Sequence, residues 1–250
     1  MIQKFDVTIT PFGLPRAVHL YLPAGYEKTA ERYPVLYFYD GHNLFSDADA
    51  TYGKSWGLGD YLDRCGKGFI AVGVECNHEG NGRLIEYYPF GEPVFGAERG
   101  LGDVYMRWVV EELKPYIDAH YRTLPGRESA MIGGSSMGGL MAAYSVIRHN
   151  DVFSKAACLS SSISLCMPQL LNLLEECPIN PGTRVYLDWG GREAGNLEGL
   201  IRMTDCNLTL AHRLAGRGAQ VYPRIVPGGE HCEASWEQQI PVFMSYLWGI

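Results

Sequence analysis

The segment Gly134-Ser135-Ser136-Met137-Gly138 constrains the fold of this chain more than any other. A short apolar run, residues 129–133, precedes the segment, and apolar residues recur at helical spacing after it. These are Leu140, Met141, Tyr144 and Ile147. A strand, a tight turn and a helix in this order describe a nucleophile elbow, in which one serine stands exposed at the end of a buried strand.

The flanking glycines indicate which serine occupies the turn. The backbone at such a turn is strained and closely packed, so residues without a Cβ are needed on both sides of the nucleophile. Gly134 and Gly138 meet this need for Ser136. A motif centred on Ser135 would put Met137 where the second glycine is required. The sequence therefore predicts that Ser136 attacks acyl carbonyls.

The first half of the chain contains strand patterns of two kinds. Residues 5–10 and 18–22 alternate apolar and polar side chains around a turn rich in proline and glycine, which predicts an antiparallel edge hairpin. Residues 34–39 and 69–74 are nearly continuous apolar runs, typical of central strands of a parallel sheet. A long helix is expected over residues 101–117, with a kink at Pro115.

Strands and helices alternate through the second half. We expect strands at residues 156–159, 184–189 and 220–226, and a helix at residues 208–214 closed by glycines. The last helix should begin at a capping box formed by Ser235 and Gln238. This alternation predicts an α/β fold with a mostly parallel central sheet, an N-terminal antiparallel hairpin and helices on both faces.

Composition limits the class of protein. A chain of 250 residues with 46% hydrophobic content can bury one large core, so we expect a single catalytic domain over residues 1–250. No apolar stretch is long enough to cross a bilayer and the N-terminus lacks a signal peptide, which favours a cytoplasmic protein without a membrane partner. A net charge of -7 without a basic cluster argues against a nucleic-acid partner.

The cysteines and the histidine-containing loop give no sign of a metal centre. The seven cysteines are scattered without a C-x-x-C pair, which fits reduced thiols better than a disulfide scaffold or a zinc site. Glu230, His231, Cys232 and Glu233 are potential ligands, but consecutive residues on one loop seldom converge on one ion. We therefore expect neither a metal nor any other cofactor.

A serine nucleophile needs a histidine base and a carboxylate that orients it. His212 falls in a helical pattern, whereas His231 follows a glycine-rich loop after a strand, so His231 is the predicted base. Glu193 lies just past the carboxyl end of the strand at residues 184–189 and is the first choice for the acid. Asp188 and Asp205 are the alternatives.

The tetrahedral intermediate formed at the serine needs two preorganised hydrogen-bond donors. One should be the backbone amide after the nucleophile, Met137, and the other should come from the loop after the strand at residues 34–39. That loop begins Asp40-Gly41-His42, so the second predicted donor is the amide of His42, whose imidazole need not react.

At these residues the chain resembles the esterase family of α/β-hydrolases, which includes enterochelin-type siderophore esterases, feruloyl and acetyl-xylan esterases, and the mycolyltransferases. Three segments give the resemblance: Pro34-Val-Leu-Tyr-Phe-Tyr-Asp-Gly-His-Asn-Leu-Phe45, Ile132-Gly-Gly-Ser-Ser-Met-Gly-Gly139, and Gly228-Gly-Glu-His231 followed by Trp236. The resemblance implies an α/β-hydrolase fold. Gly190-Gly-Arg-Glu193 is similar to the family's G-x-x-acid loop, which assigns the acid role to Glu193.

The resemblance also implies where substrate binds. The pocket would include residues 83–95, among them Arg83, Tyr87, Tyr88, Phe90 and Phe95, whose aromatic rings could stack on an aryl acyl group. Family members often have an additional N-terminal substrate-recognition module, whereas this chain begins almost at its hairpin. We therefore expect substrate selection to reside in the catalytic domain or in a partner.

Three functions are compatible with these residues. The first is a serine carboxylesterase that hydrolyses a small or medium acyl ester through an acyl-enzyme. The second is an acyltransferase with the same triad, which differs in how well the pocket excludes water. The third is a binding protein that kept the fold without catalysis. The expected partner is a small-molecule ester, and the sequence leaves open the natural ester and the oligomeric state.

Overall fold

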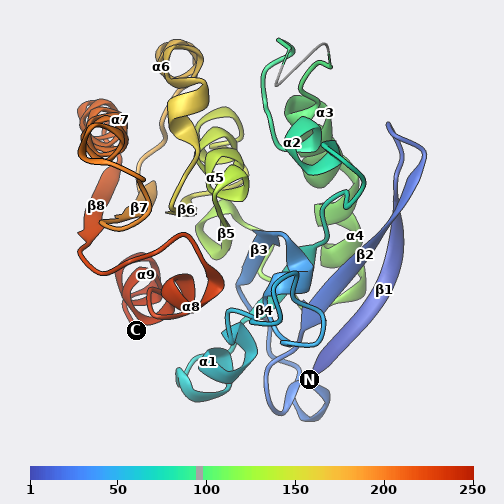
Figure 1. Ribbon diagram of the computed structural model, residues 1–250. Helices are drawn as coiled ribbons and strands as arrows, with labels where there is room; N and C mark the ends of the chain where they lie inside the picture. The colour runs from blue at the N-terminus through green and yellow to red at the C-terminus, as the bar shows by residue number, and fades with distance from the viewer. Residues whose placement is uncertain (94–97) are drawn as a thin grey trace. The chain divides into compact units, whose positions relative to one another are not determined.

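The computed structural model describes residues 1–93 and 98–250, and its ribbon is shown in Figure 1. The chain divides into two compact units, Met1–Ala130 and Met131–Ile250. Each unit consists of strands covered by helices, and each is described in turn.

The strands of the first unit confirm both strand patterns expected there. β1 (Ile2–Ile9) and β2 (Leu14–Tyr21) form the antiparallel hairpin. β2 pairs antiparallel with β4 (Ile70–Val74), and β4 pairs parallel with β3 (Val35–Tyr39) in a register that aligns Val35 with Ile70. Every residue of β3 and β4 is buried, as their continuous apolar sequences require.

The long helix of the first unit is more regular at Pro115 than expected. α3 (Gly102–Trp108) continues through a π-helical turn (Val109–Leu113) into α4 (Lys114–His120). The irregularity is the π-helical turn that precedes Pro115, and Pro115 itself stands in the first turn of α4. The shorter helices are α1 (Leu58–Arg64) and α2 (Gly82–Glu86), with single 3-10 turns at Tyr26–Lys28, Gly41–Asn43 and Arg127–Ser129.

The second unit has a parallel sheet in the order β5-β6-β7-β8. Its strands are β5 (Ala130–Ser135), β6 (Lys155–Leu159), β7 (Arg184–Gly190) and β8 (Gln220–Val226), close to the ranges expected. Its helices are α5 (Met137–Arg148), α6 (Met167–Glu176), α7 (Leu197–Gly216), α8 (Glu233–Glu237) and α9 (Ile240–Trp248), with a 3-10 turn at Ile163–Leu165. In Figure 1, α7 and α9 flank β7 and β8. Such parallel strands with covering helices give the α/β architecture predicted from the sequence.

α7 is far longer than the helix expected at residues 208–214. It begins after Asn196, whose side chain accepts a hydrogen bond from the Gly199 amide at 2.8 Å. Its first turns contain the exposed apolar residues Leu197 and Ile201, which interrupt an amphipathic pattern. For this reason the apolar spacing revealed only the second half of the helix.

The capping box expected at Ser235 and Gln238 was wrong. Ser235 lies inside α8, and Gln239 precedes α9 without a capping side chain. The first turn of α9 instead contains Pro241, whose fixed φ suits a helix start. The Ser235 hydroxyl accepts a hydrogen bond from the Glu230 amide at 2.9 Å, so it fixes the loop that contains His231.

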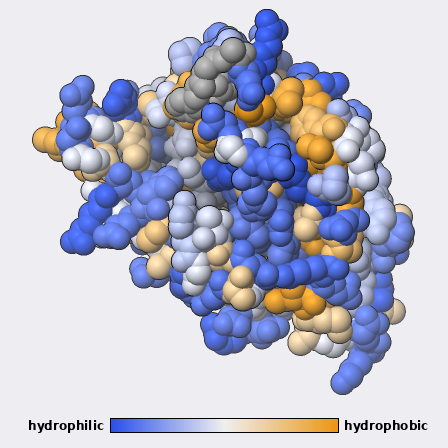
Figure 2. Space-filling view, turned by 45° about the vertical axis from the view of Figure 1, so that its right-hand side comes forward, coloured by the Kyte–Doolittle hydropathy of each residue, from blue (hydrophilic) through white to orange (hydrophobic). Residues whose placement is uncertain are grey.

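The face shown in Figure 2 is mostly hydrophilic, with smaller hydrophobic patches between. Exposed large apolar side chains such as Tyr52, Leu101 and Leu197 lie in different parts of the chain. No helix among residues 1–93 and 98–250 has the length and apolar character to span a bilayer.

Candidate active site

The serine elbow forms at the end of β5. Ser136 stands directly before α5. Its backbone angles, φ 57° and ψ −120°, are rarely adopted by residues other than glycine. A Cβ on Gly134 would lie 2.8 Å from the carbonyl carbon of Gly138, so the close approach of strand and helix requires glycine there. The strand, turn and helix predicted around Ser136 are therefore present.

The start of α5 places a partial positive charge beside the serine. Met137 is the first residue of α5, and the first N–H groups of a helix have no partner within the helix. A negative charge that develops near Ser136 is stabilised by this end of the helix. The Met137 amide, predicted from the sequence as an oxyanion donor, thus lies in a suitable place.

The loops after β7 and β8 are fixed against each other by their backbones. A Cβ on Gly190 would lie 2.3 Å from the Gly229 carbonyl oxygen, so these chains touch only because position 190 has no side chain. The Arg192 amide donates to the Gly229 oxygen at 3.0 Å, and the Gly191 amide donates to the Val226 oxygen at 2.8 Å. The loop with Glu193 is thereby attached to the loop that leads to His231.

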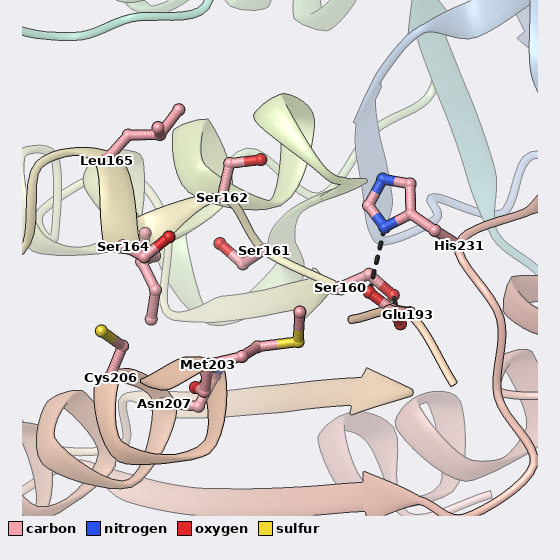
Figure 3. Close-up of a pocket in the computed structure, with 11 residues that line it drawn as sticks. Ser160, Ser161, Ser162, Ser164, Leu165, Glu193, Met203, Cys206, Asn207 and His231 are labelled. Atoms are coloured by element: carbon pink, nitrogen blue, oxygen red, sulfur yellow. Dashed lines mark hydrogen bonds and ion pairs between the residues drawn. The ribbon is translucent and has the colours of Figure 1, made fainter. Parts of the chain in front are cut away.

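Glu193 and His231 meet through their side chains. The distance between His231 Nδ1 and Glu193 Oε2 is 3.0 Å, drawn as a dashed line in Figure 3. The carboxylate is 2% exposed and the imidazole 43% exposed, so a buried anion holds a ring that faces solvent. The other oxygen, Oε1, accepts hydrogen bonds from the Ser160 hydroxyl and the Gly190 amide, each at 2.6 Å. This network fixes the carboxylate and, through it, the orientation of the imidazole.

The other acid and base candidates have different surroundings. Asp188 is buried in β7, where its carboxylate accepts hydrogen bonds from the Ser160 amide at 3.0 Å and the Tyr186 hydroxyl at 2.9 Å. Burial raises the pKa of Asp188 to about 7. Asp205 and His212 are exposed on α7. Of the three carboxylates proposed from the sequence, Glu193 is the one whose contact with His231 is present.

The serine run after β6 contacts the elbow and lines a cavity together with His231. The Oγ atoms of Ser136 and Ser162 lie 3.5 Å apart, and the Ser162 amide donates to the Ser136 carbonyl at 3.0 Å. Ser162 and His231 line one cavity of about 190 Å³. Figure 3 shows further wall residues, with Met203 and Asn207 facing the serines from α7. His231 therefore lines this cavity, and the Ser136 hydroxyl lies beside that of Ser162, another residue of its wall.

Ser160 and Ser162 were not singled out in the sequence, although a signal was present. Three consecutive serines, Ser160 to Ser162, follow directly after the buried strand β6. Polar residues at the carboxyl end of a parallel strand commonly contribute to a site, because ligands bind at that edge of an α/β sheet. Ser160 also has φ 45°, a second strained residue close to the elbow.

Trp236 supports the same network from α8. Its indole N–H donates to the Ser160 hydroxyl at 2.8 Å, and that hydroxyl donates to Glu193. The edge of its ring also packs against the His231 imidazole, with the ring centroids 5.2 Å apart. Trp236 therefore contacts His231 directly and Glu193 through one hydroxyl.

The first unit contains the remaining predicted site residues. His42 lies in the 3-10 turn Gly41–Asn43 after β3, and its Nε2 is 2.9 Å from the Thr51 hydroxyl. This turn presses against β4, because a Cβ on Gly41 would lie 2.2 Å from the Gly73 carbonyl oxygen. Burial lowers the pKa of the His42 imidazole. The role of the His42 amide as the second oxyanion donor stays a prediction.

Arg83 and Tyr87 hold the start of this turn through Asp40. The Arg83 guanidinium donates to both Asp40 carboxylate oxygens, at 2.7 and 2.8 Å. The Asp40 amide donates to the Tyr87 hydroxyl at 3.2 Å, and the Tyr87 ring is fully buried. Both side chains therefore have structural contacts, and substrate binding by them stays a prediction.

The other aromatic residues proposed for the pocket differ in burial. Tyr88 is buried, and its ring lies edge-on to the half-buried Phe90 with centroids 6.1 Å apart. Phe95 lies outside the described residues.

Comparison with known proteins identifies the family. A family model described as Putative esterase matches residues 10–246, nearly the whole chain. The chain belongs to this esterase family. The protein is therefore an enzyme that acts on ester bonds, and the family predicted from the sequence is confirmed.

Individual relatives of this esterase are distant in sequence but similar in fold. It is 22% identical to YbbA of Bacillus subtilis (strain 168) over 192 residues, which are 75% of this chain and 72% of YbbA. An IroE-like serine hydrolase from Shewanella oneidensis has a TM-score of 0.75 at 22% identity, covering 94% of this chain and 77% of that one. The BES protein from Bacillus cereus has a TM-score of 0.77 at 20% identity, with 98% and 94% covered.

A third similar structure is larger than this esterase. The enterobactin esterase FES from Shigella flexneri, solved in the presence of enterobactin, has a TM-score of 0.77 at 18% identity. The match covers 100% of this chain and 59% of that one. These likenesses confirm the α/β-hydrolase fold expected from the sequence.

Proposed function

We propose that this esterase is a serine carboxylesterase that hydrolyses a small or medium acyl ester through a triad of Ser136, His231 and Glu193. The observation that carries the proposal is the 3.0 Å contact of His231 Nδ1 with Glu193, at a cavity shared with Ser162, whose hydroxyl is 3.5 Å from that of Ser136. A serine is a weak nucleophile until a base removes its proton, and an exposed imidazole anchored by a buried carboxylate supplies that base.

The reaction follows from these positions. Ser136 Oγ attacks the ester carbonyl, and the unbound ring nitrogen of His231 takes its proton. Glu193 accepts the hydrogen bond from Nδ1–H, which fixes the tautomer and stabilises the imidazolium. The amides of Met137 and His42 bind the oxyanion. Collapse releases the alcohol, which takes the proton from His231, and a water molecule then cleaves the acyl-enzyme by the same steps.

The cavity wall supports a substrate that bears hydroxyl groups. Four serines, Ser160, Ser161, Ser162 and Ser164, and the amide of Asn207 line it together with the apolar side chains of Leu165 and Met203. A wall of this kind suits a ring or chain with hydroxyl substituents. Structural relatives include a siderophore hydrolase and a ferulic acid esterase. We therefore expect dihydroxybenzoyl or hydroxycinnamoyl esters to be hydrolysed faster than their unsubstituted counterparts.

The nucleophile is tested by comparing Ser136→Ala with Ser135→Ala, its neighbour in β5. Hydrolysis of p-nitrophenyl butyrate and covalent labelling by a fluorophosphonate are measured for both. We expect Ser136→Ala to lose at least about 1,000-fold in kcat and all labelling, because the covalent step needs its hydroxyl. Ser135→Ala should keep the label. Full activity in Ser136→Ala would reject the mechanism.

Transfer of the acyl group to an added alcohol in preference to water would identify an acyltransferase with the same triad.

A further inference from the structure

Three potential metal ligands cluster in the first unit, beside the strands β3 and β4. His42, Cys76 and His78 each present one ligand atom, and these atoms lie within 4.8 Å of one another. Cys76 Sγ is 3.9 Å from His78 Nδ1, and the imidazole centroids of His42 and His78 are 4.6 Å apart. Cys76 and His78 belong to the loop that follows β4, and His42 belongs to the turn that follows β3.

In each of the two histidines, the Nε2 atom of the ring already has a polar partner. His42 Nε2 lies 2.9 Å from the Thr51 hydroxyl, and His78 Nε2 lies 3.3 Å from Glu75 Oε2. A hydrogen bond at one nitrogen, often to a carboxylate, orients the ring of a metal-binding histidine and leaves the other nitrogen free to coordinate. In both rings that other nitrogen is Nδ1.

His42 Nδ1 has no partner in the part of the chain that the structure describes. The atom is buried without a hydrogen bond, and the residue is 4% exposed. A buried polar atom is normally satisfied, since leaving it unpaired costs free energy. His42 belongs to a cluster that also contains a thiol and a second imidazole. A bound cation would pair with the His42 nitrogen and would explain why a thiol and a second imidazole lie beside it.

We propose that His42 Nδ1, Cys76 Sγ and His78 Nδ1 bind a zinc-type divalent cation. One sulfur and two imidazole donors favour zinc over the oxygen-binding cations magnesium and calcium. In a tetrahedral zinc site a sulfur and a nitrogen ligand are about 3.6 Å apart, so the separation between Cys76 and His78 needs only a small contraction.

The surroundings provide an entry path and an outer carboxylate. The His78 side chain is 53% exposed, so a cation reaches the site from that side and can keep a water as its fourth ligand. Glu75 contacts His78 of the cluster and a third histidine. Its Oε2 lies 3.3 Å from His78 Nε2, and its Oε1 lies 2.7 Å from His19 Nε2. This arrangement matches the carboxylate–histidine pairs found around metal sites.

The cation would join the loop after β4 to the turn that contains His42. That turn is already packed against β4 at Gly41 and Gly73. The ion would therefore have a structural role in holding the turn whose His42 amide is the proposed second oxyanion donor. No metal was expected from the sequence, because the cysteines form no C-x-x-C pair and the potential ligands considered, residues 230–233, are consecutive on one loop.

The test measures metal binding and is independent of ester hydrolysis. The whole protein, stripped with a chelator, is titrated with Zn²⁺ in competition with a chromophoric chelator, and in parallel with Co²⁺. We expect one equivalent of either ion and a near-ultraviolet thiolate-to-cobalt charge-transfer band. Cys76→Ser should abolish that band, and Cys76→Ser and His78→Ala should each weaken Zn²⁺ binding at least about tenfold, a loss that even an outer partner of a metal ligand can cause.

Matched variants distinguish this site from other thiols and imidazoles. Cys65→Ser and His120→Ala remove the same residue types elsewhere in the first unit and should bind like the wild type. Glu75→Gln keeps all three ligands and should reduce affinity less than His78→Ala. Because His78 is exposed, His78→Ala keeps the test valid should Cys76→Ser fail to fold. The proposal is overturned by wild-type protein that binds no equivalent of Zn²⁺, or by His78→Ala that binds it unchanged.

Discussion

At the scale of single residues, the two neighbouring carboxylates Glu193 and Asp188 have opposite surroundings. Glu193 accepts hydrogen bonds from His231, Ser160 and Gly190, and so can orient an imidazole. Asp188 accepts hydrogen bonds from a backbone amide and a tyrosine, away from the imidazole.

We predict that Glu193→Gln lowers kcat at least about 100-fold, since the imidazole loses its anionic partner. Asp188→Asn and Asp205→Asn should retain most activity. An active Glu193→Gln enzyme would move the acid role to a neighbour.

Asp188 should make the stability of the protein depend on pH. Its pKa is about 7 in the folded state against an ordinary value of 3.8, chiefly because it is buried. Between these values the folded state binds more protons than the unfolded state, so the free energy of unfolding falls as pH rises from about 4 to about 7. From pH 5 to pH 8 this group alone should remove on the order of 2 kcal/mol.

Asp188→Asn isolates this effect. Asparagine cannot ionise, its oxygen can still accept from the Ser160 amide, and its NH₂ can donate to the Tyr186 oxygen. Urea unfolding at pH 5 and pH 8 should show that the variant loses less stability than the wild type over this interval. Asp205→Asn, an exposed carboxylate on α7, is the control and should behave like the wild type. Equal losses in Asp188→Asn and the wild type would contradict a raised pKa.

At the scale of elements, α8 contacts two residues of the proposed triad through Trp236, His231 directly and Glu193 through Ser160. Its indole N–H holds the Ser160 hydroxyl at 2.8 Å, and that hydroxyl holds Glu193. We predict that Trp236→Phe lowers kcat about tenfold or more with little change in KM, because the carboxylate loses a preorganised contact. Trp189→Phe is the control, since it also loses one indole hydrogen bond, to Thr204 at 2.9 Å, but has no contact with Glu193 or His231 in the described network. Equal kinetic losses in both variants would indicate general destabilisation.

Elements with strong local patterns were predictable, and contacts between distant elements were not. The apolar runs of β3 and β4 and the glycines around Ser136 determine local structure, so they gave correct positions. The start of α7 was missed, because its exposed apolar residues hide the helical period. The hydrogen bond from Trp236 to Ser160 joins α8 to the end of β6. These residues are far apart in the chain, so the spacing of residues in the sequence cannot predict their contact. The residues that motifs revealed are thus those of the proposed triad, whereas the contacts that support them needed coordinates.

At the scale of the whole molecule, the question is whether the two units fold as one domain. The family match over residues 10–246 spans both Met1–Ala130 and Met131–Ile250, and the sequence predicts a single domain. The proposed triad lies in the second unit, while the proposed second oxyanion donor, the His42 amide, lies in the first. We therefore expect one cooperative unfolding transition, because the proposed reaction needs both units ordered together.

Hydrogen exchange of the whole protein tests this cooperativity with a change confined to one unit. As pH rises from 5 to 8, Asp188→Asn should lose less stability in the second unit than the wild type, for the reason given above. In a single cooperative domain the slowest amides exchange through global unfolding, so amides of β3 and β4 in the first unit must gain the same protection as amides of β6 and β7. At pH 5 the gain should be smaller in both units. Protection that increases only within Met131–Ile250 would mean that the units unfold separately, and the prediction of a single domain would then be wrong.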